Sequence, residues 1–97
     1  MTEVPRLGID DPILRRFRAA LSELYGDRLE RVVSDYDIAV FLTDVGPFWD
    51  EVDRLVHVET HLLYDTGAVI NSMPYRAGAY HDRTSLMREI RREGIDL

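Results

Sequence analysis

Apolar side chains recur at helical spacing in two long stretches of the chain. The first stretch follows Asp11, a good N-cap residue, and ends at Gly26. The second runs from about Phe48 to Tyr64 and stops at Gly67. Each spacing predicts an amphipathic helix with one side in the core. The residues predicted to be buried are Ile13, Leu14, Phe17, Ala20, Leu21 and Leu24 in the first helix, and Trp49, Val52, Leu55, Val56, Leu62 and Leu63 in the second.

A shorter apolar repeat predicts a third helix near the end of the sequence. Thr84 or Ser85 can cap its first turn, and Leu86, Met87 and Ile90 follow at helical spacing. The pair Gly94-Ile95 predicts a Schellman ending, in which glycine takes the left-handed conformation and the next apolar residue folds back.

Three segments between these helices have the character of strands. They are Leu29 to Val33, Tyr36 to Leu42 and Ala68 to Met73, and Pro74 should close the last because proline cannot donate to a ladder. The order of elements is helix, strand, strand, helix, strand, helix. We therefore expect residues 1–97 to form one α+β domain (α/β in the broad sense), with a small mixed three-stranded sheet flanked by helices.

Composition narrows the class of protein. The chain has 97 residues, no cysteine and a formal net charge of −6. An acidic chain without clustered Lys is a poor ligand for a nucleic-acid backbone, so we expect no direct nucleic-acid binding. No apolar run is long enough to span a bilayer, and the first residues show no secretory signal, so a cytoplasmic location is predicted.

Two carboxylates one residue apart, Asp35 and Asp37, open the second strand segment. Because side chains alternate along a strand, both should point to one face while Tyr36, Ile38 and Val40 point to the core. Neighbouring carboxylates repel unless a cation lies between them, and Mg²⁺ commonly takes one or two carboxylates plus phosphate oxygens. The spacing predicts a polyphosphate site, and the alternative is an ordinary polar turn.

The run Ser34-Asp35-Tyr36-Asp37-Ile38-Ala39-Val40, on the middle strand of this layout, resembles the minimal nucleotidyltransferases of the DNA polymerase beta superfamily. The likeness spans nearly the whole chain and looks strongest to the antitoxins encoded beside HEPN-domain ribonuclease toxins. It implies a nucleotidyltransferase fold and transfer of AMP from ATP to a tyrosine of the toxin, within a complex of the two proteins. It also implies that Asp35 and Asp37 are the catalytic pair and the Mg²⁺ ligands.

The phosphate-binding segment of that family has no counterpart here. In the family a Gly-Ser before the paired acids opens a short helix that holds the triphosphate. In this chain Val33 is followed directly by Ser34, so no nucleotide-binding residue is identified. Either a mobile loop belongs at this point, and a Val33–Ser34 bond far from about 1.33 Å would reveal it, or the segment is deleted and the domain is inactive. Without a loop, Ser34-Asp35 would be an unfavourable two-residue connection.

The third carboxylate of many family members is also in question. The matching polar position on 68–73 is Asn71, which cannot act as a base, and Asp65 is a weaker substitute. Three functions therefore remain open for this chain. Within the family they are a Mg²⁺-dependent nucleotidyltransferase and a degenerate domain that neutralises its toxin by occlusion. Outside the family, the chain is an acidic structural subunit in which Asp35 and Asp37 have no catalytic role.

Further polar groups have simpler explanations. Asp53, His57, His61 and Asp65 form a stripe at four-residue spacing on the second helix. A zinc site on the two histidines is the minor alternative to a solvated or partner-facing stripe. Arginines gather in the first and last helices, where they either dock an acidic partner or form solvated faces.

Overall fold

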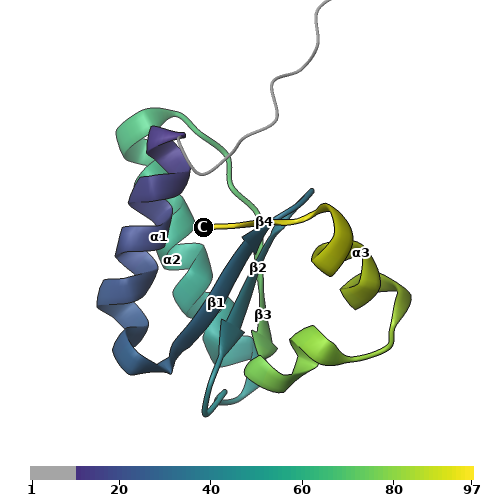
Figure 1. The fold of residues 1–97 in the computed structure, drawn as a ribbon. Coiled ribbons are helices and arrows are strands. Elements are labelled where there is room, and N and C mark those ends of the chain that lie inside the picture. Colours follow the sequence, from purple (N-terminus) through teal and green to yellow (C-terminus); the bar gives the residue numbers. More distant parts are fainter. Residues whose placement is uncertain (1–10) are drawn as a thin grey trace, which may run out of the picture.

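A four-stranded sheet lies between two layers of helix in this computed structural model, which describes residues 11–97 (Figure 1). The prediction about a secretory signal concerns residues outside this range. Helices α1 and α2 cover one face of the sheet, and α3 lies on the other. The elements are α1 (Pro12–Tyr25), η1 (Gly26–Arg28), β1 (Leu29–Ser34), β2 (Ile38–Leu42), α2 (Phe48–Thr66), β3 (Ser72–Arg76), η2 (Ala77–His81), α3 (Ser85–Glu93) and β4 (Ile95–Asp96).

The sheet has the strand order β3-β2-β1-β4. β1 and β2 form an antiparallel hairpin, α2 makes the crossover to β3, which runs parallel to β2, and β4 pairs antiparallel with β1. The predicted α+β class with a mixed sheet is confirmed. The predicted count of three strands is one too low, because Ile95 and Asp96 add a short strand against Ser34 and Val33. No helix within residues 11–97 is long and apolar enough to cross a membrane.

The helix boundaries follow the capping residues. The carboxylate of Asp11 accepts the N–H groups of Ile13 and Leu14 at 2.8 and 3.2 Å, and the hydroxyl of Thr84 caps α3. Gly67 ends α2 in the left-handed conformation, with φ +76°. These predictions are confirmed.

The Schellman ending predicted at Gly94 is wrong. Its φ of −73° and ψ of 154° are extended, and the chain continues directly into β4. Glycine is needed here for space, since a Cβ would overlap the side chain of Val33 and the carbonyl oxygen of Ile90. The close approach lets the end of α3 pass against β1.

Strand β3 begins four residues later than predicted and includes Pro74, so the predicted strand 68–73 is misplaced. The N–H of Ile38, in β2, donates to the carbonyl of Asn71, just before β3. In a parallel pair only every second residue of a strand bonds to the neighbouring strand, so the odd-numbered residues of β3 are the ones that bond to β2. Pro74 therefore turns its missing donor toward the open edge, where no ladder bond is lost. The preceding outward N–H, of Ser72, donates to Glu59 on α2 at 3.1 Å.

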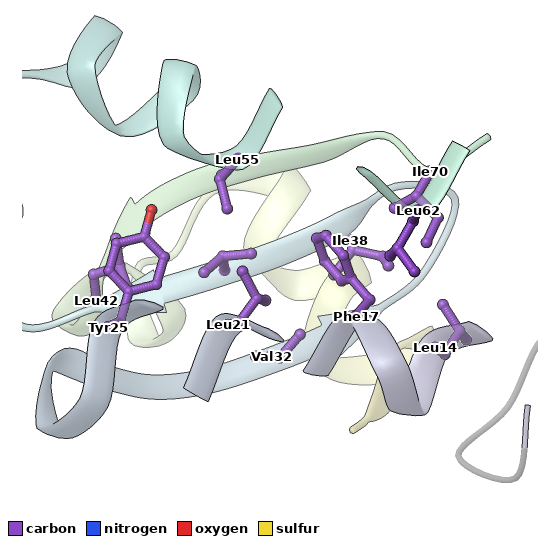
Figure 2. Packing of buried hydrophobic residues seen from close by; sticks show 11 residues of the cluster. Leu14, Phe17, Leu21, Tyr25, Val32, Ile38, Leu42, Leu55, Leu62 and Ile70 are labelled. Atoms are coloured by element: carbon purple, nitrogen blue, oxygen red, sulfur yellow. The ribbon is translucent and has the colours of Figure 1, made fainter. Parts of the chain in front are cut away.

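Two apolar clusters occupy the two faces of the sheet. Figure 2 shows the larger one, in which α1, α2 and the sheet interlock around Phe17, Leu21 and Leu42. The smaller one contains Val33, Ala39, Phe41, Ala79, Met87 and Ile90. All five residues of β2 are buried, because η2 and α3 cover the face that sequence alternation had left free for a cation.

The buried face of α2 is narrower than predicted. Leu55 and Leu62 are buried, but Trp49, Val56 and Leu63 are exposed, so their predicted place in the core is wrong. The third fully buried position is Glu51. Predicted core positions are confirmed in α1 at Leu14, Phe17 and Leu21, whereas Leu24 is exposed and Tyr25 is buried instead.

Glu51 joins α2 to η1 and to the connection between β2 and α2 through an ionic cluster around its buried carboxylate. Its carboxylate is 0% exposed and accepts bonds of 2.5 Å from each of Arg28 and Arg54, and a third bond from the N–H of Gly46. Burial acts to raise the pKa of Glu51, but the bonds from Arg54, Gly46 and Arg28 together hold it below its usual value. Arg28 also donates to the carbonyl of Asp44, so the cluster fixes the connection from β2 to α2.

Candidate functional site

The two acidic residues singled out from the sequence lie at the tip of the β1–β2 hairpin. Ser34 pairs with Ile38, which leaves Asp35, Tyr36 and Asp37 as a three-residue loop. The N–H of Asp35 donates to the carbonyl of Asp37 at 3.0 Å and closes the loop. The predicted two-residue connection is therefore wrong, and so is the start of β2 at Tyr36. Tyr36 does not reach the core, since its side chain is 91% exposed.

Asp35 and Asp37 nevertheless face the same cavity. This cavity, of about 130 Å³, lies between the hairpin, β3 and α3. Its remaining lining includes Tyr75 from β3 and Glu89 from α3. Tyr36 borders the same cavity, so all three loop residues line it. The predicted alternation, with Asp35 and Asp37 on one side of a strand and Tyr36 on the other, is therefore wrong.

Asp37 acts electrostatically on two other elements. Burial raises the pKa of Glu59, hydrogen bonds from Ser72 lower it, and the negative charge of Asp37 raises it further, with a net upward shift. Burial also raises the pKa of Tyr75, and Asp37 adds to that rise. The negative charge of the hairpin tip is therefore felt by Glu59 on α2 and by Tyr75 on β3.

The residues expected to supply a third carboxylate are placed elsewhere or lack the group. Asn71 is exposed just before β3 and uses its backbone carbonyl to accept from Ile38. Asp65, on α2, pairs with Arg16 of α1 at 3.0 Å. The acids that approach the hairpin are Glu59 and Glu89, which sequence reasoning missed because they come from the interior of two helices.

The described residues fit a bound metal and nucleotide only in part. Mg²⁺ can be held by two carboxylates when water and phosphate oxygens complete its shell, and Asp35 and Asp37 offer that minimum. Within residues 11–97, however, no group of three or more His, Cys, Asp or Glu side chains is arranged to hold a metal ion. The N–H of Asp35 is not available to a phosphate, because it donates to the carbonyl of Asp37.

The junction of Val33 and Ser34 lies inside a regular strand. Val33 pairs with Ala39 and Ser34 with Ile38 on one side, and both pair with β4 on the other. These are the residues between which the family resemblance would place a Gly-Ser segment. In this structure the two residues already pair with β2 and with β4.

A second hollow, of about 440 Å³, lies between α1 and α2. His57, His61 and Asp65 line it together with Arg16, so three members of the predicted polar stripe share one groove. Several arginines of the two predicted clusters are used internally. Arg91 donates to the carbonyls of Tyr80 and Asp82, and Arg18 donates to the carbonyl of Leu97.

Comparisons with protein-family models, curated proteins and solved structures found no match to this chain.

Proposed function

We propose that this chain is a protein-binding module that neutralises a HEPN-domain ribonuclease partner by occluding it, without transferring a nucleotide. The family resemblance of the sequence supplies the class of partner. The closed hairpin and the exposed surface of α2 support occlusion as the mode of action.

The hairpin is the observation that carries the proposal. Nucleotidyl transfer depends on neutralising and positioning the phosphates, which the protein does with metal ions and preorganised N–H groups. Here the two carboxylates stand on a closed three-residue loop, next to strand residues whose backbone is already paired. The third acid is not supplied by Asn71 or Asp65.

Incubation of the partner ribonuclease with this chain, ATP and Mg²⁺, followed by intact-mass measurement, tests the proposal. We expect ribonuclease activity to fall in proportion to complex formation, with no AMP added to the ribonuclease. Neutralisation should be unchanged when ATP is omitted. An AMP adduct that appears only with ATP, together with loss of neutralisation when ATP is left out, would contradict occlusion.

Mg²⁺-dependent nucleotidyl transfer is the second candidate, because Asp35 and Asp37 line one cavity. In that case these two residues would hold Mg²⁺, and the metal would neutralise the phosphates of ATP. The substitutions Asp35→Asn and Asp37→Asn keep the side-chain shape and remove the charge. Loss of an AMP adduct in both variants would favour this candidate.

A further inference from the structure

We propose that the outer face of α2 is a docking surface for a positively charged amphipathic helix of the partner protein. The surface, named the outer stripe here, consists of Trp49, Val52, Val56 and Leu63. The inference rests on the proposed binding function and adds the place of contact and the chemistry of the bound segment.

The outer stripe is a separate apolar face of α2. At 100° per residue its four members fall within about 60° of one another and about 100° away from Leu55 and Leu62, which face the sheet. Trp49 is 74% exposed, Val56 46% and Leu63 43%. None of the four belongs to either buried cluster. Their spacing of three, four and seven residues is that of one side of a helix–helix seam.

Trp49 gives this surface an anchor at the first turn of the helix. Its ring packs edge-on against Phe48, with 5.0 Å between centroids, and Phe48 is itself exposed. Exposed aromatic and apolar side chains grouped on one face are typical of interaction sites, and tryptophan is enriched among the residues that dominate binding energy.

Charge indicates the kind of partner. On the first turns of α2, Asp53 lies about 40° around the helix from Trp49, and Asp50 lies about 100° away on the same side. Among residues 11–97 neither carboxylate has an ion-pair or hydrogen-bonded partner. The other acids of the helix interior are engaged, Glu51 with two arginines and Glu59 with Ser72. A basic segment would compensate the two free carboxylates, whereas a second copy of this chain would bring further negative charge. The net charge of −6 favours the same choice.

The neighbouring sheet edge explains why a helix fits better than a strand. The outer stripe lies on the side of α2 where Glu59 reaches β3. Along that edge the Ser72 N–H is occupied by Glu59, and Pro74 has no N–H to offer. Strand addition needs a row of free backbone groups, and two neighbouring donors of this edge are missing from that row. A helix needs only apolar side chains to pack against.

The chain contains a single tryptophan, so its fluorescence reports on the outer stripe alone. The probe is a tryptophan-free synthetic peptide of about 18 residues, or five helical turns, with leucines at i, i+3, i+4 and i+7 and flanking lysines. A twin peptide carries glutamates instead of lysines. We expect a saturable blue shift of the Trp49 emission with the lysine peptide and at least about tenfold weaker binding of the glutamate peptide. No shift, or equal binding of both peptides, would overturn the inference.

Adjacent substitutions supply a matched control. Val56→Asp puts a charge in the outer stripe, and His57→Asp puts the same residue about 100° around the helix, in the α1–α2 groove. We expect Val56→Asp to weaken peptide binding by about tenfold or more and His57→Asp by less than about twofold. Leu63→Asp should repeat the effect of Val56→Asp at the other end of the stripe. Circular dichroism verifies that all three variants are folded.

Neutralisation of the partner ribonuclease separates the two proposals. If Val56→Asp neutralises as well as the parent chain, the outer stripe is wrong while occlusion stands. If the parent chain needs ATP to neutralise, occlusion is wrong whatever the peptides do. A concentration-dependent dimer of this chain that Val56→Asp dissociates would overturn the choice of a basic helix in favour of a second copy.

Discussion

The two apolar sides of α2 carry similar side chains in different surroundings. On the inner side, Leu55 and Leu62 are buried against α1 and the sheet, beside the carboxylate of Glu51. On the outer side, Trp49 and Val56 meet solvent. The inner side therefore contributes to folding and the outer side is available for binding. Sequence periodicity alone cannot distinguish the inner from the outer apolar side, because residues that are close together on a helix can face different environments.

The largest difference should appear when one side chain is shortened on each side of the helix. Leu55→Ala should lower the free energy of unfolding by about 3 kcal/mol, because it opens a cavity in the core. Val56→Ala should change it by less than about 0.5 kcal/mol, because nearly half of Val56 stays exposed in the folded state and it packs in neither apolar cluster. Urea denaturation of both variants measures the difference. Equal losses would show that the outer side also stabilises the isolated fold.

A buried and an exposed carboxylate of α2 should also differ in how much they contribute to the free energy of unfolding. Glu51→Gln should cost about 2 kcal/mol of unfolding free energy, since it leaves Arg28 and Arg54 without their shared counterion. The loss is moderated because both guanidinium groups are partly exposed. Asp53→Asn serves as the control on an exposed position and should stay within about 0.5 kcal/mol. Similar losses from the two variants would contradict the structural role of the buried cluster.

The stability contributions of two glutamates of α2, Glu51 and Glu59, should depend on pH in opposite directions. The pKa of Glu51 is lowered in the folded chain, so its stabilisation is present above the ordinary glutamate value of about 4.3 and is lost as pH falls through the folded value. The pKa of Glu59 is raised, so the folded chain gains stability from that group as pH falls from neutral toward the ordinary value.

Unfolding of Glu51→Gln and Glu59→Gln across pH 3 to 7 would test these signs, which follow from the linkage of protonation to folding. The first variant should lose less stability on acidification than the parent chain, and the second should lose more. A parent-like pH profile in both variants would show that neither carboxylate is coupled to folding as the structure indicates.

Local signals in the sequence were sufficient for the helices. Asp11, Gly26, Gly67 and Thr84 mark boundaries through their own backbone and side-chain chemistry, so no knowledge of the rest of the fold is needed. Pro74 misled because its effect depends on whether the strand lies at an edge, which is a property of the sheet. Gly94 misled because it is required by the approach of Val33, a residue distant in sequence.

In the candidate site, too, local features could be predicted from the sequence and features that depend on packing could not. That Asp35 and Asp37 lie at one place could be predicted from their nearness in sequence, but the strand alternation assigned to them does not apply to a loop. The approach of Glu59 and Glu89 could not, because it depends on how α2 and α3 are placed against the hairpin. The outer stripe was visible as apolar residues, but only the packing of α2 shows that they are left uncovered.

The smallest effect on stability is expected at the hairpin. Asp35→Asn and Asp37→Asn should each change the free energy of unfolding by less than about 0.5 kcal/mol, because the loop is closed by backbone atoms and both side chains are at least partly exposed. Thermal unfolding measures this. A large loss would mean that the two carboxylates support the fold through contacts with the β3–α3 cavity.

The most direct test compares the hairpin with the outer stripe in one assay of partner neutralisation. The double variant Asp35→Asn/Asp37→Asn and the single variant Val56→Asp are titrated against the ribonuclease, and residual RNA cleavage is measured. Binding through the outer stripe predicts that the double variant neutralises like the parent chain and that Val56→Asp fails at equal concentration. Full neutralisation by Val56→Asp together with failure of the double variant would contradict this account and place the function at the acidic hairpin.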